Sequence, residues 1–134
     1  RGQALWHVAA WPVLREPYRL ASRHFAFEGR CFVLAVATCL KKEELLAAVP
    51  AGEKAARAFL DSVPVDEDGF LLEGGVAAYA PDGRPLAAHA AEKGGLHLFE
   101  VNPAQALEAA ANLDVAGHYS RPDIITLQLR ESKA

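Results

Sequence analysis

The chain has 134 residues, of which 51% are hydrophobic and 23% charged, and its formal net charge at pH 7 is -3. This size and composition fit one domain with one hydrophobic core. The slight negative charge provides no basic field for phosphate backbones or anionic lipid, and no stretch approaches the ~18 apolar residues of a membrane-spanning helix, so we expect neither nucleic-acid nor membrane partners.

The beginning of the sequence carries no targeting signal. The first residues lack the basic region, apolar run and cleavage site of a signal peptide, so the expected location is the cytoplasm. The sequence starts at Arg1 and contains no methionine, so we expect a processed chain or a piece of a longer protein.

The first half of the chain is predicted to alternate strands with helices. Two apolar runs favour strands, over residues 5–10 and 31–39. Helices are predicted over residues 17–29, 41–49 and 53–63. Pro12, Gly29 and Pro50 stand at the boundaries, because proline removes a backbone donor and glycine favours a helix end. Cys31 and Cys39 would lie roughly 26 Å apart along their strand, too far for a disulfide, so two free thiols are expected.

The helix predicted over residues 17–29 carries one unusual carboxylate. Tyr18, Ala21 and Phe25 form its apolar stripe, and Glu28 continues the same spacing. A carboxylate on such a stripe should be desolvated, and a desolvated carboxylate is retained when it is paired. Glu28 is therefore either half of a structural ion pair or part of a functional site. Trp11-Pro12, at the exit of the first strand, either lines a pocket or packs under this helix.

The second half is predicted to form an antiparallel meander, then a helix and a last strand. The meander strands cover residues 76–80, 86–91 and 96–101. The turns between them are Pro81-Asp82-Gly83 and Lys93-Gly94-Gly95. An acidic loop is expected over residues 65–69. Pro103 suits the first turn of a helix that ends near Leu113 and is capped by Asn102, and a final strand is expected over residues 124–129.

This order of elements predicts an α/β fold over residues 1–134, with helices stacked on one face of a mixed sheet of about five strands. In the run 31–39, alternate residues are apolar on both sides of the strand. The sheet face without helices is therefore apolar and uncovered, and we expect a partner to cover it.

Few residues predict chemistry. The five histidines have no helical pairing, and Gly74-Gly75 and Gly94-Gly95 precede strands, so we expect no metal, no phosphate loop and no cofactor. Cys39 is the one candidate nucleophile, because it follows a strand, precedes a helix and has Lys41 and Lys42 nearby, which lower a thiol pKa. The alternative is a small, inert residue at a strand end.

Several segments match one known pattern. They are residues 8–12, residues 22–34, the hairpin from Gly74-Gly75 to Pro81-Asp82-Gly83, residues 92–102 and residues 113–123. Together they resemble the C-terminal half of the nitrilase family of carbon-nitrogen hydrolases, although Val76 replaces the usual serine of the hairpin. The resemblance implies part of a four-layer α-β-β-α sandwich. It also implies hydrolysis of a small nitrile or amide to a carboxylic acid and ammonia, through a cysteine thioester assisted by a glutamate and a lysine.

The family's catalytic cysteine, glutamate and lysine precede the segment that matches residues 5–12, so the resemblance places none of them in this chain. It implies no catalytic residue here, and the residues expected to border the substrate are Trp11, Pro12 and Glu28. Three interpretations follow. The chain is the C-terminal part of a hydrolase that is inactive without its N-terminal half, or a non-catalytic module that self-associates through the open sheet face, or a small hydrolase that uses Cys39.

Overall fold

A mixed four-stranded sheet forms the centre of the computed structural model, which describes residues 4–89, 95–113, 121–124, 126 and 128. The elements are β1 (Trp6–Trp11), α1 (Glu16–Gly29), β2 (Phe32–Ala37), β3 (Cys39–Lys41), α2 (Lys42–Ala48), α3 (Lys54–Ser62), β4 (Phe70–Glu73), β5 (Val76–Tyr79), β6 (Pro85–His89) and α4 (Ala104–Asn112). The central sheet has the order β1-β2-β5-β6, and β3 pairs with β4 in a separate ribbon. β1 runs parallel to β2, whereas the pairs β2–β5 and β5–β6 are antiparallel. The predicted α/β class with a mixed sheet is therefore confirmed.

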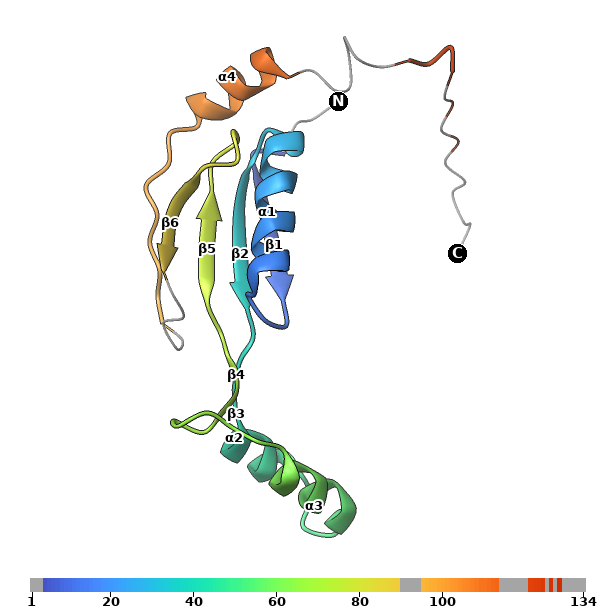
Figure 1. Cartoon of the computed structure of the whole chain (residues 1–134), viewed down its shortest axis with the longest axis vertical. Coiled ribbons are helices and arrows are strands. Elements are labelled where there is room, and N and C mark those ends of the chain that lie inside the picture. The colour runs from blue at the N-terminus through green and yellow to red at the C-terminus, as the bar shows by residue number, and fades with distance from the viewer. Residues whose placement is uncertain (1–3, 90–94, 114–120, 125, 127, 129–134) are drawn as a thin grey trace.

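α1 covers one face of this sheet (Figure 1). The positions it buries are Ser22 and Ala26, four residues apart, and both are small enough to let the helix approach β2 closely. Beneath the helix lie the alternate residues of β2 and β5 that point to this face, including Val33, Ala35 and Tyr79. This contact forms the main hydrophobic core.

The apolar stripe predicted for α1 is displaced by one residue. Ala21 is exposed and Phe25 is 47% exposed, whereas Ser22 and Ala26 are buried. Phe25 lies at the margin of the helix, where its ring stacks on His7 with centroids 4.2 Å apart. A prediction based on the large apolar residues therefore misplaced the buried face of α1, because close packing on the sheet favours small side chains at the contact.

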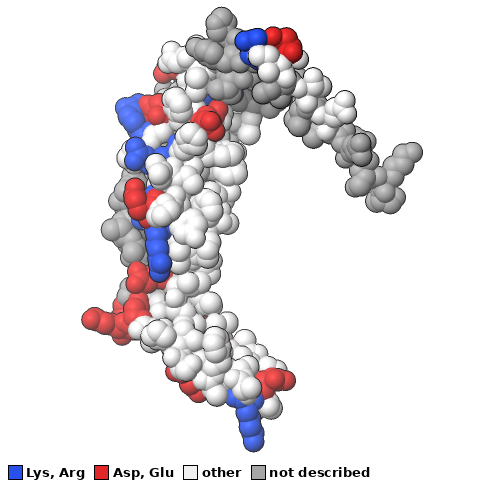
Figure 2. Space-filling model, turned by 45° about the vertical axis from the view of Figure 1, so that its right-hand side comes forward, with Lys and Arg blue, Asp and Glu red and all other residues white. Residues whose placement is uncertain are grey.

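The opposite face of the sheet is open along the part nearest β1. Trp6 is 42% and Val8 is 61% exposed, and their neighbours Leu34, Val36 and Val76 are half-buried. Figure 2 shows that Lys, Arg, Asp and Glu side chains gather along one side of the molecule and leave a broad uncharged surface beside them. The expected apolar face without its own helical cover is thus present among the described residues.

α4 closes one end of that open face. Its buried Ala106 clusters with Phe32 and Ala80, whose side chains point away from α1. The expectation that all helices lie on one face is therefore wrong, because α4 packs at the end of the opposite face. The cap of α4 is confirmed, since the Oδ1 atom of Asn102 accepts a hydrogen bond from the Ala104 amide at 3.1 Å.

The β3–β4 ribbon carries α2 and α3 away from the central sheet (Figure 1). The Nη2 atom of Arg57 donates to the Val49 carbonyl at 2.7 Å, and the Nζ atom of Lys42 donates to the Asp61 carbonyl at 2.9 Å. Neither helix buries a residue. In the ranges that the structure describes, no helix combines the length and apolar character needed to cross a bilayer.

Most predicted elements of the first half exist. The strands β3 and β4 were not predicted, and the strand predicted over residues 96–101 in the second half is absent from the described structure. β3 and β4 pair across 28 residues of intervening chain, a sequence separation over which local periodicity carries no information. Residues 96–101 form no strand, although exposed Leu96 and Leu98 alternate with half-buried neighbours. Of the final strand, Ile124 lies in a turn, and residues 125, 127 and 129 fall outside the described residues, as do the turn residues 93 and 94.

Candidate functional site

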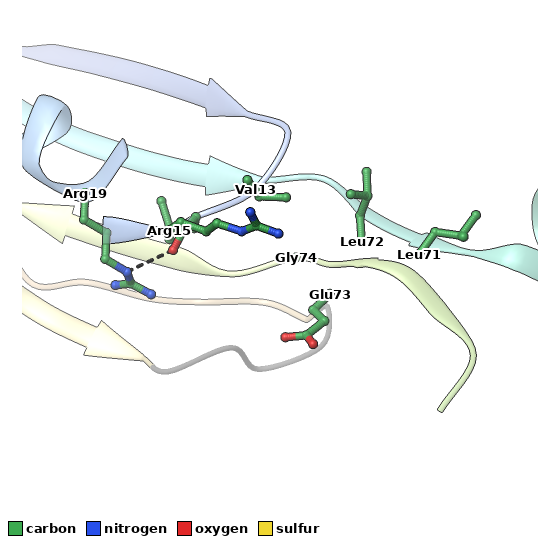
Figure 3. Close-up of a pocket in the computed structure, with 8 residues that line it drawn as sticks. Val13, Arg15, Arg19, Leu71, Leu72, Glu73 and Gly74 are labelled. Atoms are coloured by element: carbon green, nitrogen blue, oxygen red, sulfur yellow. Dashed lines mark hydrogen bonds between the residues drawn. The ribbon is translucent and has the colours of Figure 1, made fainter. Parts of the chain in front are cut away.

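A cavity of about 250 Å³ lies where the segment after β1 passes β4 of the β3–β4 ribbon (Figure 3). It is lined by Val13, Leu14, Arg15, Arg19, Leu71, Leu72, Glu73 and Gly74. Half of these residues are apolar, and the charged ones comprise two guanidinium groups and one carboxylate. The cavity is therefore amphiphilic, with a net positive lining.

Arg15 and Arg19 both line the cavity, Arg15 as the extended N-cap residue of α1 and Arg19 from the first turn of the helix. Figure 3 shows the Arg15 guanidinium on the side of Val13 and the Arg19 guanidinium beside the Leu14 carbonyl. The Nε atom of Arg19 donates to the Leu14 carbonyl at 3.1 Å, which fixes the direction of the guanidinium. Burial raises the pKa of the Tyr79 hydroxyl, and a hydrogen bond and charge from Arg19 partly offset this rise. Arg19 is thus positioned by two neighbours.

Gly74 forms the floor of the cavity next to Glu73. Its φ of +83° lies in the left-handed region, and a Cβ atom built on it would lie 3.1 Å from the Cβ atom of Cys39. Only glycine meets both conditions without strain. Gly74-Gly75 therefore connects β4 to β5 of the other sheet, and the predicted hairpin turn at this position is wrong, because the two strands do not pair with each other.

Trp11 lies at the end of β1 on the α1 side of the sheet. It packs on α1, which is one of the two alternatives expected from the sequence. Its Nε1 atom donates to the Ser22 Oγ atom at 3.0 Å, and its ring lies 4.8 Å from the Tyr18 ring, centroid to centroid. Pro12 is exposed and leads directly into the cavity wall at Val13. The predicted substrate role of Trp11 and Pro12 remains a prediction.

The predicted desolvation of Glu28 is wrong. Its side chain is 61% exposed, because it lies two positions after the buried Ala26 and so points away from the sheet. Its Oε2 atom lies 3.4 Å from the His24 Nε2 atom, an exposed contact one turn back on the same helix. Trp11 contacts the first half of α1 and Glu28 lies near its end, so the structure does not bring these two candidates together.

Cys39 has no activating neighbour in the described part of the chain. It is exposed at the start of β3, and the two lysines expected to activate it are engaged elsewhere. Lys41 lies 3.7 Å from Glu43, and Lys42 reaches the Asp61 carbonyl. Cys31 is buried, and burial raises the pKa of its thiol, an effect that the charge of Arg30 partly offsets. Both cysteines are free, as expected.

Sequence reasoning missed the charged residues of the cavity. The sequence did contain a signal for them, since Arg15 and Arg19, four residues apart, follow shortly after Trp11-Pro12. Glu73 could not be assigned to the same place, because β4 reaches it through a ribbon that was not predicted. Within the described ranges, no group of three His, Cys, Asp or Glu side chains is arranged to hold a metal ion.

Comparison with known proteins identifies relatives of one kind. The chain is 32% identical over 139 residues to a nitrilase of Penicillium rubens, which covers 92% of this chain and 39% of the relative. It is 34% identical over 137 residues to an aliphatic nitrilase of Rhodococcus rhodochrous, with 92% of this chain and 33% of the relative covered. A nitrilase of Pseudomonas syringae pv. syringae is 34% identical over 136 residues, covering 90% of this chain and 36% of the relative. No protein-family model matches the chain.

The matches cover nearly all of this chain, while the chain spans little more than a third of the length of the relatives. The resemblance to nitrilases is therefore confirmed, for a segment that corresponds to part of such a protein.

Proposed function

We propose that this chain is the C-terminal part of a nitrilase-like carbon-nitrogen hydrolase. The complete enzyme converts a small nitrile or amide to a carboxylic acid and ammonia through a cysteine thioester. The nucleophilic cysteine and its glutamate and lysine partners belong to a segment outside residues 1–134. The isolated chain is consequently inactive.

The open sheet face is the observation that carries this proposal. Trp6 and Val8 expose large apolar surfaces next to the half-buried Leu34 and Val36. A free protein rarely leaves such a continuous apolar surface to water, because covering it is favourable in proportion to its area. The N-terminal half of the same hydrolase covers this face with its own sheet and completes a four-layer α-β-β-α sandwich.

The extent of the similarity supports the same assignment. The nitrilases match the chain along nine-tenths of its length and leave more than half of their own length unmatched. The segments in residues 22–34 and 113–123, which resemble the C-terminal half of the family, give the matched part its position in the enzyme.

In the proposed enzyme, Trp11 and Pro12 border the substrate. Trp11 is held at the end of β1 by its hydrogen bond to Ser22, and Pro12 stands between it and the cavity. Glu28 lacks comparable support, because its carboxylate lies in water near the other end of α1. Cys31 is buried, and in the described structure the lysines near Cys39 contact Glu43 and the Asp61 carbonyl instead, so we assign neither cysteine a catalytic role.

The same open face supports a second candidate, a non-catalytic module in which two copies of the chain cover each other. The two candidates differ in what completes the sheet. In the first it is an N-terminal half that carries the catalytic residues, and in the second it is an identical surface.

The coding sequence upstream of Arg1 tests the proposal. We expect it to encode a cysteine at a strand-to-helix elbow, preceded by the glutamate and lysine. The protein expressed with this extension should release ammonia from nitriles or amides, and replacement of the upstream cysteine by alanine should abolish the release.

The 134-residue chain and its Cys39→Ala variant are the matched controls. We expect no turnover from the chain alone and unchanged turnover when Cys39→Ala is introduced into the extended protein. Ammonia release by the short chain that is lost in Cys39→Ala would refute the proposal. An upstream sequence without a cysteine elbow, together with a stable dimer of the short chain, would favour the self-associating module.

A further inference from the structure

We infer that the cavity between the start of α1 and β4 binds a small monocarboxylate with a short apolar chain. Its lining brings two guanidinium groups to one partly apolar hollow. The role of this site in catalysis rests on the proposed function, but its binding chemistry depends on this chain alone.

The two arginines are available to a ligand. Arg15 and Arg19 place two like charges in the lining of one cavity, and these charges repel each other. Among the described residues, neither guanidinium forms an ion pair, and Glu73 on the facing wall forms none either. An anion in the cavity would offset this repulsion by its opposite charge and accept hydrogen bonds from a guanidinium group.

The guanidinium group selects the chemical class of that anion. Its planar array of donors matches the two oxygens of a carboxylate, and such charge-assisted bonds are the stronger kind. Glu73 contributes a negative charge to the same lining, which leaves a net charge of +1 from two arginines and one glutamate. A singly charged carboxylate balances this lining, whereas a phosphate or a dicarboxylate places a second negative charge against Glu73.

The apolar part of the lining determines the size and character of the rest of the ligand. Val13, Leu71 and Leu72 also line the cavity, with Val13 beside Arg15 and the two leucines on the ribbon (Figure 3). The volume of about 250 Å³ falls below the roughly 300–1,000 Å³ of pockets for drug-sized molecules. A carboxylate with a few methylene groups therefore fits, with its head at the arginines and its tail toward the leucines.

In a carbon-nitrogen hydrolase, a carboxylate ligand of this kind has two sources. Hydrolysis of a nitrile or amide yields a carboxylate, so the cavity holds either the product or a carboxylate that the substrate carries away from its reacting group. Both sources present the same head group to Arg15 and Arg19.

Titration of the 134-residue chain with sodium pentanoate and with neutral pentanamide tests the site, followed by calorimetry and by the arginine Nε–H resonances in NMR spectra. We expect saturable binding of pentanoate, about tenfold or more tighter than that of pentanamide, because charge-assisted bonds are lost with the amide. Arg15→Gln and Arg19→Gln should each weaken pentanoate binding by about tenfold.

Arg23→Gln is the matched control, because Arg23 is an exposed arginine one turn further along α1 that does not line the cavity. It should leave pentanoate binding unchanged. Arg15→Gln separates binding from folding, since the exposed Arg15 side chain makes no hydrogen bond in the described structure, unlike that of Arg19. Glu73→Gln should tighten pentanoate binding and admit the dicarboxylate glutarate.

Equal binding of pentanoate and pentanamide, or equal affinities in Arg15→Gln, Arg19→Gln and Arg23→Gln, would overturn the inference. In the extended protein, Arg15→Gln should relieve inhibition by pentanoate if the site holds product. It should instead raise the KM for 4-cyanobutanoate, and not for pentanenitrile, if the site holds a carboxylate of the substrate. An extended protein that hydrolyses no nitrile would refute the proposed function, while the titration of the short chain would still decide the site.

Discussion

Trp11 and Ser22 join the end of β1 to the buried face of α1. The Trp11 Nε1 atom donates to the Ser22 Oγ atom at 3.0 Å, and that hydroxyl in turn donates to the Tyr18 carbonyl at 2.8 Å. Ser22 is 1% exposed, so water does not replace either partner. The pair holds the chain in place just before it enters the cavity segment at Val13.

Replacement of Ser22 by alanine should lower the free energy of unfolding by about 1 to 2 kcal/mol, because the indole N–H loses its acceptor in a partly buried place. Urea unfolding followed by tryptophan fluorescence measures this loss. In a double-mutant cycle, Trp11→Phe should remove most of the penalty of Ser22→Ala. Additive losses in the double variant would show that the two side chains are not coupled.

Replacement of Gly74 by alanine should destabilise the fold by about 1 to 2 kcal/mol, since a left-handed backbone is costly for any residue with a Cβ atom. The new methyl group would also press on Cys39. Gly52→Ala is the control, because a Cβ atom there meets nothing within 4 Å and no positive φ is involved. Thermal unfolding should separate the two variants, and equal melting temperatures would contradict the structure.

The two thiols should differ in reactivity. Exposed Cys39 should react rapidly with a thiol reagent such as DTNB at pH 8, whereas buried Cys31 should react slowly, because burial hinders access and raises the pKa of its thiol. Cys39→Ala should remove the rapid phase and leave the slow one. A single fast phase of both thiols in the folded protein would be inconsistent with a buried Cys31.

The raised pKa of the Cys31 thiol predicts a loss of stability at high pH. In the folded state the thiol keeps its proton at pH values where the unfolded chain has released it. Stability is therefore complete below the ordinary thiol pKa of about 8.5 and falls as the pH rises toward the folded value. Urea unfolding between pH 8 and 10 should show that the free energy of unfolding falls less steeply in Cys31→Ala than in the parent chain. Buried Tyr79 is present in both proteins, so its contribution does not affect this comparison.

The open sheet face should drive association of the isolated chain. Val8→Asp should shift the chain toward a monomer in size-exclusion chromatography with light scattering, because the charge opposes burial of that surface. Val8 is 61% exposed, so the unfolding free energy of the monomer should change little. Phe59→Asp, at a comparably exposed residue of α3, is the control. A parent chain that is already monomeric would argue against the uncovered face.

Local pattern was sufficient for much of the fold. The strand run 31–39 and the helix run 17–29 were predicted because their spacing and composition act over a few residues. The same alternation showed that β2 is apolar on both sides, and the resemblance to nitrilases depended on short segments that are visible in the sequence. These features need no knowledge of what packs against them.

Tertiary structure decided the features that depend on contacts between segments distant in the sequence. The buried face of α1 follows Ser22 and Ala26 because the distance to β2, and not the size of the apolar residues, selects the contact. Residues 96–101 have the alternation of a strand and yet form no strand in the described structure, since a strand exists only where an edge receives its hydrogen bonds. The β3–β4 ribbon places Glu73 in the same cavity lining as Arg15 and Arg19, so the charged cavity arises from a pairing across the sequence that no local signal encodes.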